Sequence, residues 1–148
     1  MGRGVLIDHK RWTDANGKTY SPFTDRRITI EEIETIAKEE GVTFKQGDII
    51  IIRTGFTEAL TGIPDEEQMQ KIGQKSCGVE GTPESAKWFW NRHFAAVAGD
   101  ALGFEALPPL NNGEEAGINE LGKFRQPFAS MMSELIRLLS TQSSTNIF

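Results

Sequence analysis

Apolar residues recur every three or four positions from Thr29 to Glu40, and this spacing predicts an amphipathic helix. Thr29 and Glu32 have the spacing of a capping box, in which the hydroxyl and the carboxylate each accept a backbone amide hydrogen in the first turn. Gly41 follows the pattern, and glycine readily adopts the left-handed conformation that ends many helices. The apolar stripe consists of Ile30, Ile33, Ile36 and Ala37. We therefore expect this helix to pack against a larger element.

Shorter apolar runs predict strands. Ile49–Ile52 is an uninterrupted run of isoleucines, which predicts a central strand buried on both faces. Val5–Ile7 predicts a strand close to the first residue, and Phe94–Ala98 predicts a strand of mostly small residues. Thr82–His93 has a helical pattern with a threonine N-cap candidate followed by proline. The order of elements over residues 48–100 is typical of a crossover between parallel strands, so the sequence predicts a mixed α/β fold.

The remaining segments are more polar. Asp14–Asp25 contains turn residues and predicts a loop, and residues 56–81 predict a long connection with a short helix near Asp65–Ile72. Residues 111–126 have little apolar content. Pro127–Ser140 then predicts a second amphipathic helix, before a polar, frayed tail. The apolar positions of that helix are Phe128, Met131, Met132, Leu135, Ile136 and Leu139.

Composition narrows the class of protein. The chain has 148 residues, of which 38% are hydrophobic and 25% charged, as in an ordinary globular domain. Its formal net charge of −5 disfavours broad contact with nucleic acid or an anionic membrane, so we expect neither as a partner. A single cysteine excludes an internal disulfide, and no stretch is long and apolar enough to predict a membrane span or a signal peptide. We expect a cytoplasmic protein.

Candidate binding residues follow the predicted strands. Arg53, Thr54 and Gly55 come directly after the isoleucine run, and Asp100 comes after the small-residue strand, with Glu105 shortly beyond. Ligands tend to bind at such strand ends in sheets covered by helices. The sequence therefore predicts that these residues line one substrate pocket. For Asp100 a second interpretation stays open, in which the carboxylate accepts backbone amides of the next turn.

The histidines and the cysteine carry weaker signals. His9 is interpreted as a loop residue, and His93 as a helix C-terminal residue near unpaired carbonyls. Cys77 has no histidine near it in sequence, and a lone cysteine is in most proteins inert. We therefore assign no catalytic residue and no metal ligand within the chain.

Four strings in the sequence resemble the cyclase family of metal-dependent hydrolases, in particular its fungal cyclase-like branch. These strings are Gly2–Asp8, Ile28–Ile33, Gly47–Gly55 and His93–Asp100. The family includes bacterial-type kynurenine formamidase, an arylformamidase of tryptophan catabolism. The resemblance implies a swivelling β/β/α domain, assembly into oligomers, and hydrolysis of an amide by water bound to a divalent metal such as zinc or manganese. The best-known substrate of the family is the small molecule N-formylkynurenine.

The chain departs from the family pattern at both ends of this resemblance. The His-x-Gly-Thr-His-x-Asp-x-Pro-x-His motif, which supplies metal ligands in the family, precedes the first matching string and is absent here. The family's later ligand histidine and glutamate also have no counterpart, because the similarity ends near residue 110. We therefore expect an incomplete cyclase-like domain over residues 1–110 and a divergent C-terminal segment over residues 111–148, with no cofactor held by this chain.

These departures leave several interpretations open. The chain is expected to be inactive alone, because loss of the metal site removes the nucleophilic water. One alternative is a non-catalytic pseudoenzyme that associates with a complete cyclase subunit through an exposed sheet edge, or with copies of itself. Another is an incomplete gene prediction whose full product carries the missing motif.

Overall fold

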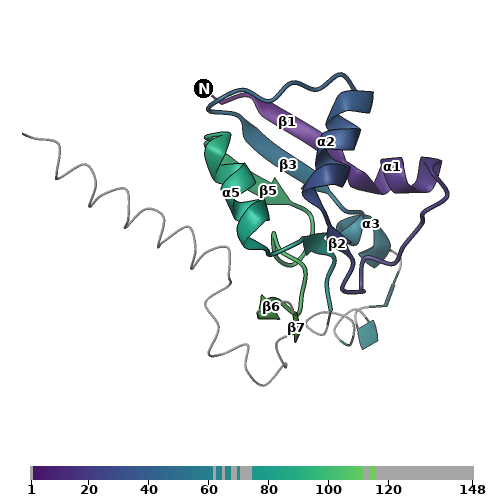
Figure 1. Cartoon of the computed structure of the whole chain (residues 1–148). Coiled ribbons are helices and arrows are strands. Elements are labelled where there is room, and N and C mark those ends of the chain that lie inside the picture. Colours follow the sequence, from purple (N-terminus) through teal and green to yellow (C-terminus); the bar gives the residue numbers. More distant parts are fainter. Residues whose placement is uncertain are drawn as a thin grey trace, which may run out of the picture.

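The fold is built around a parallel sheet of three strands. The computed structural model describes residues 2–61, 63–64, 66–67, 70, 75–111 and 114–115. The strands β1 (Gly4–Asp8), β3 (Ile49–Arg53) and β5 (Ala96–Gly99) pair in parallel in the order β1-β3-β5 (Figure 1). The predicted crossover is confirmed, and β3 is the central strand, as the isoleucine run indicated.

Two crossover connections complete the fold, and each contributes one strand to a small parallel sheet, β2-β4. After β5 the chain forms an antiparallel pair, β6-β7. In chain order the remaining elements are α1 (His9–Ala15), β2 (Arg27–Ile28), α2 (Ile30–Glu39), α3 (Phe56–Leu60), β4 (Gly78–Val79), α5 (Pro83–Asn91), β6 (Leu110–Asn111) and β7 (Glu114–Glu115). The fold is therefore mixed α/β, as predicted.

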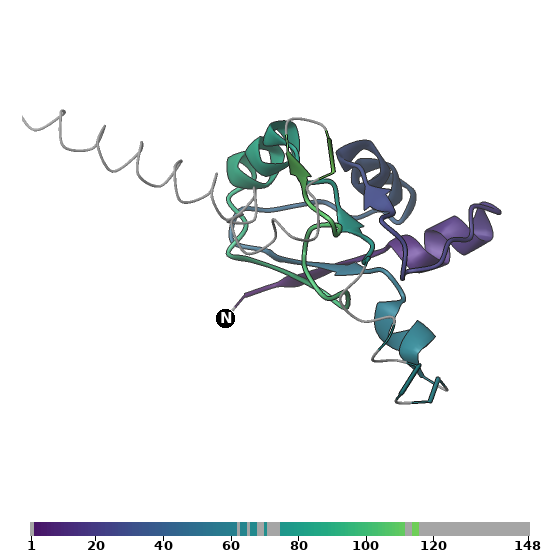
Figure 2. The same ribbon diagram turned by 90° about the horizontal axis from the view of Figure 1, so that it is seen from below.

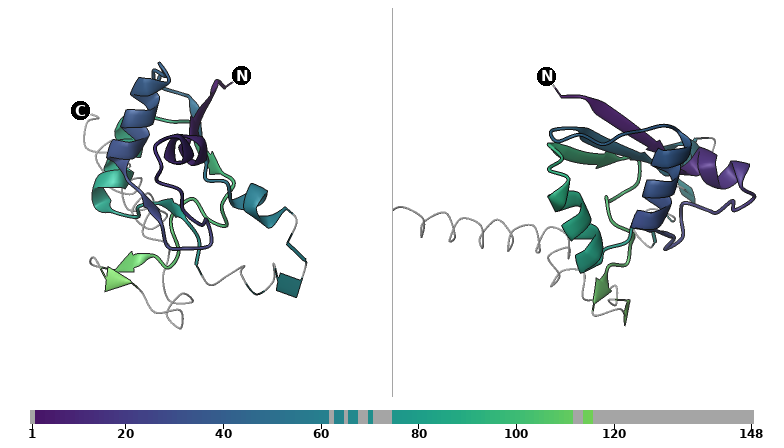
Figure 3. Two further views of the ribbon diagram at one scale, coloured as in Figure 1. Left: turned by 90° about the vertical axis from the view of Figure 1, so that its right-hand side faces the viewer. Right: turned by 45° about the horizontal axis from the view of Figure 1, so that its top comes forward.

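The core lies between the large sheet and the two longer helices. In Figure 2 and Figure 3, α2 and α5 lie on the same side of the β1-β3-β5 sheet. Alternate residues of each strand point to that side, and the core cluster joins Ile7, Ile50 and Ile52 to Ile36 of α2 and Phe89 of α5. Burial of these side chains supplies the main driving force for this packing.

The capping of both longer helices agrees with the prediction. The Thr29 hydroxyl accepts a hydrogen bond from the Glu32 amide at 3.3 Å, and the Glu32 carboxylate accepts one from the Thr29 amide at 3.2 Å. Gly41 adopts a positive φ of 66° just after α2. The hydroxyl of Thr82 caps α5 in a similar way, through the Ser85 amide at 3.2 Å.

The prediction that β3 is buried on both faces is wrong. Ile50 and Ile52 are buried, but Ile51 is 38% exposed and Leu6, its neighbour on β1, is 49% exposed. The reason is that α2 and α5 both cover the same face of the sheet. The opposite face is left open by the residues that the structure describes.

The interpretation of His9 as a loop residue is also wrong. His9 begins α1 and is completely buried. The helix forms there because the Asp8 carboxylate accepts a hydrogen bond from the Arg11 amide at 3.0 Å and so caps the first turn. Trp12 then packs against the core cluster.

Other expectations lie mostly outside the described part of the chain. They include the short helix near Asp65–Ile72 and the amphipathic helix over Pro127–Ser140. Of the described residues, none belongs to a helix long and apolar enough to cross a membrane.

Candidate functional site

The carboxyl ends of the three parallel strands bring most of the predicted pocket residues together. Asp8 at the end of β1 is in register with Arg53 at the end of β3, and Thr54 follows directly. Asp100 follows β5, the other neighbour of β3. We call this group, with Gly55, the strand-end cluster.

Asp100 is the hydrogen-bonding centre of this cluster. Its Oδ1 accepts hydrogen bonds from the Thr54 amide at 2.6 Å and the Thr54 hydroxyl at 2.7 Å. Its Oδ2 accepts one from the Gly55 amide at 2.9 Å and a longer one from the Thr57 hydroxyl at 3.5 Å. The carboxylate therefore binds the turn of the neighbouring strand. Of the two interpretations considered for Asp100, the structure is closer to the amide-accepting one, although the amides belong to a distant segment.

These bonds also decide the ionisation of Asp100. Partial burial acts to raise its pKa, but the hydrogen bonds from Thr54 and Gly55 outweigh that effect and hold the pKa below its ordinary value. Asp100 is therefore a carboxylate near neutral pH. Because its oxygens are already engaged, it is placed to position the turn and not to transfer a proton.

Gly55 occupies a place that no other residue fits well. Its φ is 82°, in the left-handed region, where it forms the N-cap of α3. A Cβ on Gly55 would also lie 2.8 Å from Cγ of Lys10. The stem of Lys10 thus packs directly against the backbone of the turn.

Arg53 is held from two sides at the rim of the cluster. Its guanidinium donates a hydrogen bond to Asp8 Oδ1 at 2.7 Å and also pairs with Glu58 of α3. Asp8 therefore caps α1 and orients Arg53 at once. About a third of the Arg53 side chain remains exposed, and two carboxylates surround its single positive charge.

Tyr20 and His9 are linked to the cluster by hydrogen bonds, and the sequence pattern indicated neither of them as part of it. The Tyr20 hydroxyl donates a hydrogen bond to the Thr54 carbonyl at 2.9 Å. Since its only proton is used there, Tyr20 accepts the hydrogen bond from His9 Nδ1 at 3.0 Å. These two hydrogen bonds place the proton of neutral His9 on Nδ1. The only available sequence signal was the position of His9 directly after a strand that ends in Asp8.

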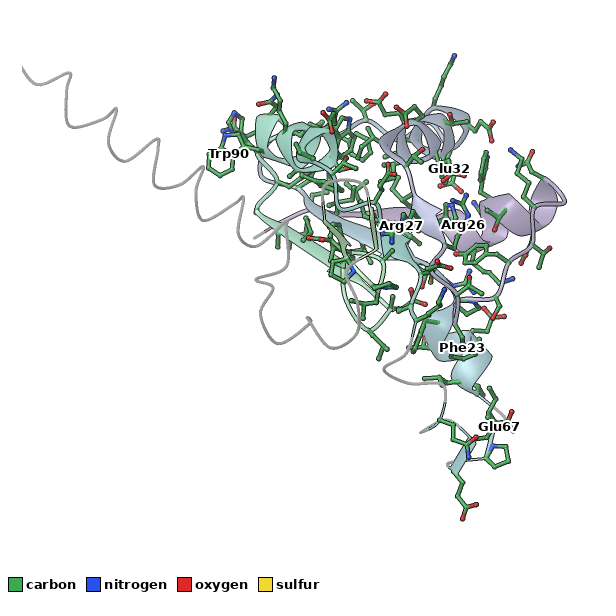
Figure 4. All side chains as sticks on the ribbon, turned by 60° about the horizontal axis from the view of Figure 1, so that its bottom comes forward. Phe23, Arg26, Arg27, Glu32, Glu67 and Trp90 are labelled. Carbon is green, nitrogen blue, oxygen red and sulfur yellow. The ribbon has the colours of Figure 1, made fainter. Side chains whose placement is uncertain are left out.

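The other ring nitrogen of His9 faces a carboxylate. Nε2 lies 3.6 Å from Glu32 Oε2 and has no hydrogen-bond partner within the described chain. Burial lowers the pKa of His9 to about 4, although the Glu32 carboxylate acts in the opposite direction. Glu32 in turn pairs with Arg26, and both side chains are labelled in Figure 4. His9 is consequently a neutral, structural histidine near neutral pH.

Cys77 lies close to this cluster but is poorly suited to act as a nucleophile. The side chain is completely buried. Burial raises the pKa of the thiol, while a hydrogen bond involving Thr54 partly offsets this, so the protonated form is favoured. Its amide donates a hydrogen bond to the Pro22 carbonyl at 3.0 Å. The expectation that Cys77 is inert agrees with this environment.

Glu105, the fifth predicted pocket residue, is placed beside the small sheet. It forms an isolated parallel bridge with Val79 of β4 and is only 4% exposed. Its carboxylate fits against Gly81, where a Cβ would lie 2.5 Å from Oε2. The structure therefore brings four of the five predicted residues into one cluster and leaves Glu105 beside β4.

The described residues do not form a metal site of the kind that the family resemblance implies. Within the described ranges, no group of three or more histidine, cysteine, aspartate or glutamate side chains is arranged to hold a metal ion. The imidazole of His9 is bonded to Tyr20, and Asp100 is saturated by amides and hydroxyls. We therefore assign no metal-dependent step to these side chains.

Comparisons with known proteins agree with the fold and the motifs. The family model described as "Putative cyclase" matches residues 1–106, so this chain belongs to that cyclase family. The resemblance of the sequence to the cyclase family is thus confirmed. A crystal structure described as a novel cyclase has a similar fold, with a TM-score of 0.63 over 77% of this chain.

That likeness concerns the fold alone, since the two sequences are 24% identical. The match spans only 36% of the length of the crystallised cyclase. No curated protein matches this chain.

Proposed function

We propose that this chain supplies the substrate-binding side of a cyclase-family amide hydrolase, and that it does not hydrolyse an amide without metal ligands from elsewhere. The observation that carries the proposal is the saturated hydrogen bonding of Asp100, which makes the Thr54–Gly55 turn a rigid platform at the strand ends. Rigid elements of this kind suit the positioning of a small molecule. In the family that the sequence resembles, zinc or manganese supplies the activated water.

The charges around Arg53 favour a substrate with a positively charged group. Asp8 and Glu58 together place two negative charges beside one guanidinium. N-formylkynurenine, the formamide best known as a substrate of this family, is an α-amino acid that carries an α-ammonium group beside an α-carboxylate. We therefore use it as the probe of the proposed surface.

The test separates binding from hydrolysis. N-formylkynurenine is titrated into the full chain, and the amide resonances of Thr54 and Gly55 are followed by NMR. We expect these resonances to shift, while hydrolysis with added zinc or manganese stays at the rate in buffer. Tight binding of one metal ion with turnover, or a titration without shifts at the cluster, contradicts the proposal.

A charge substitution tests the contact directly. Glu58→Gln is expected to weaken binding about twofold to fivefold, as for a partly exposed ion pair. Glu84→Gln, on the exposed first turn of α5 and far along the chain from the cluster, is the matched control and leaves the affinity unchanged.

A second candidate function is association with a complete cyclase subunit. It is favoured by the sheet order, because β1 and β5 each pair on one side only within the described sheet. Such edges can accept a strand from another chain. At the start of β5 the Ala95 amide donates a hydrogen bond to the Asp48 carbonyl, so the amides of the alternate residues Ala96 and Ala98 point to the free edge. Copurification of the chain with a complete cyclase, lost when a proline replaces Ala98, supports this candidate.

A further inference from the structure

The open face of the β1-β3-β5 sheet is a continuous apolar surface. In register across it lie Leu6, Ile51 and Ala98, and the next row towards the strand starts is Gly4, Ile49 and Ala96. Leu6 and Ile51 are 49% and 38% exposed. Large exposed apolar side chains that sit side by side indicate a surface that another element covers.

The shape of this face suits a helix. Gly4 has no Cβ, and a Cβ built there would lie 3.7 Å from Cδ1 of Ile51, so the isoleucine side chain lies low over β1. On the other side, the alanines of β5 keep the surface shallow. The face therefore has an apolar ridge formed by Leu6, Ile49 and Ile51 beside a shallow flank on β5, against which a helix can approach closely.

The apolar surface also continues past the edge of β5. A cavity of about 380 Å³ lies between β5 and the end of α5, and it is lined by Trp90, Phe94, Ala96 and Val97 among others. Ala96 belongs to both the open face and this cavity. An element that crosses the sheet at β5 thus finds room for a large side chain.

We propose that residues 127–139 of this chain dock on the open face as an amphipathic helix. Their sequence repeats apolar residues at helical spacing, from Phe128 through Leu135 to Leu139. A helix of that length is about 18–20 Å long, and three paired strands of about five residues cover a similar length. The size of the predicted helix therefore matches the surface.

The chain that precedes this segment is long enough to reach the face. Residues 116–126 lie between the end of β7 and Pro127, and an extended chain of eleven residues spans up to about 36–40 Å. A tethered segment also has an effective concentration in about the millimolar range, whereas a second copy at micromolar concentration competes poorly. These two considerations favour the chain's own C-terminal segment as the occupant.

Crosslinking in the full chain tests this placement. Cys77→Ser removes the native thiol, and cysteines are introduced as Ile51→Cys and Leu135→Cys. Packed layers lie about 10 Å apart, so a short bifunctional maleimide is used instead of disulfide formation. We expect an intramolecular crosslink as the main product at low micromolar protein.

Two controls define the contact surface. Ser133→Cys paired with Ile51→Cys places the thiol on the opposite side of the predicted helix, and Gln46→Cys paired with Leu135→Cys places the other thiol in an exposed turn. Each control pair is expected to crosslink at least tenfold more slowly than the Ile51–Leu135 pair. Equal rates in all three pairs contradict the proposal.

The other outcomes are also decisive. Crosslinked dimers as the main product show that a second copy covers the face, and the absence of any crosslink shows that the segment does not dock. If a cysteine variant fails to fold, as judged by circular dichroism, hydrogen exchange of the unmodified chain is used to test whether the segment docks. Slow exchange of the amides of residues 130–139 supports the proposal, and exchange at the rate of an unstructured peptide overturns it.

Discussion

Asp100 joins the end of β5 to the end of β3 by holding Thr54 through both the backbone amide, at 2.6 Å, and the side-chain hydroxyl, at 2.7 Å. The two residues are far apart in sequence and lie at the ends of neighbouring strands. One carboxylate oxygen thus ties together two crossover units of the fold, and the second oxygen holds the amide of Gly55. This relationship makes Asp100 a positioning residue of the strand-end cluster.

We first predict that Asp100→Asn destabilises the protein by about 2 kcal/mol, because an amide NH₂ in place of one oxygen leaves a donor facing the donors of the Thr54–Gly55 turn. The midpoint of urea unfolding is the measurement. Asp14→Asn, which changes an exposed pair with Lys10, is the control and shifts the free energy of unfolding by less than about 0.5 kcal/mol. Equal effects of the two substitutions argue against the anchoring role.

The ionised state of Asp100 gives this contribution a pH dependence. Its pKa is lower in the folded chain than the ordinary value of 3.8. The stabilisation is therefore present above pH 4 and decreases as the pH falls through the folded pKa, since the unfolded chain binds the proton more readily. In Asp100→Asn this part of the acid dependence disappears.

Gly55→Ala tests the close packing of the turn against Lys10. Gly55 and Gly47 have the same φ of 82°, but only Gly55 has a side chain within reach of a new Cβ. We expect Gly47→Ala to cost about 1 kcal/mol from backbone strain alone, and Gly55→Ala to cost more. Thermal unfolding of both variants measures the difference. Adding Lys10→Ala to Gly55→Ala is expected to remove the additional destabilisation that Gly55→Ala shows over Gly47→Ala. A double variant as unstable as Gly55→Ala contradicts the packing explanation.

Loss of the helix cap at Thr29 has a predictable cost. Thr29→Ala removes the acceptor for the Glu32 amide and is expected to destabilise the protein by about 1 kcal/mol. Thr35→Ala is the control, because Thr35 lies within α2 and its hydroxyl bonds only to the Glu31 carbonyl. Urea unfolding compares the two variants, and an unchanged midpoint for Thr29→Ala shows that the cap contributes nothing.

His9 links stability to mildly acidic pH. Its pKa is about 4 in the folded chain against an ordinary value of 6.5, mainly because of burial. The unfolded state therefore binds more protons between these values, and the stabilisation present above pH 6.5 is lost progressively as the pH falls to 4. We expect unfolding free energy measured across this range to decline with falling pH.

His9→Asn separates this effect from other titrating groups. The asparagine amide can donate a hydrogen bond towards Tyr20 but does not titrate, so the decline between pH 6.5 and pH 4 becomes shallower. A His9→Asn profile parallel to that of the unmodified chain contradicts the assignment of neutral His9.

Only part of the candidate site could be predicted from local patterns in the sequence. Arg53, Thr54 and Asp100 could be predicted as neighbours because parallel strands end at one edge of a sheet. Tyr20 could not, since it lies in a polar loop whose path depends on contacts with Thr54 and His9. The position of Glu105 could not be predicted, because it depends on a bridge to Val79, a non-local pairing that no periodicity records.

The sequence by itself determined the elements whose physics is local. The capping box of α2, the left-handed Gly41 and the strand character of β3 all arise from residues within a few positions of one another. Tertiary structure alone decided which face of β3 is covered, because α2 and α5 both pack on the side of Ile50 and Ile52 and leave Ile51 exposed. It also decided that Asp100 is an anchor and that His9 is neutral, since burial and the partners of a charged group depend on segments brought together only by folding.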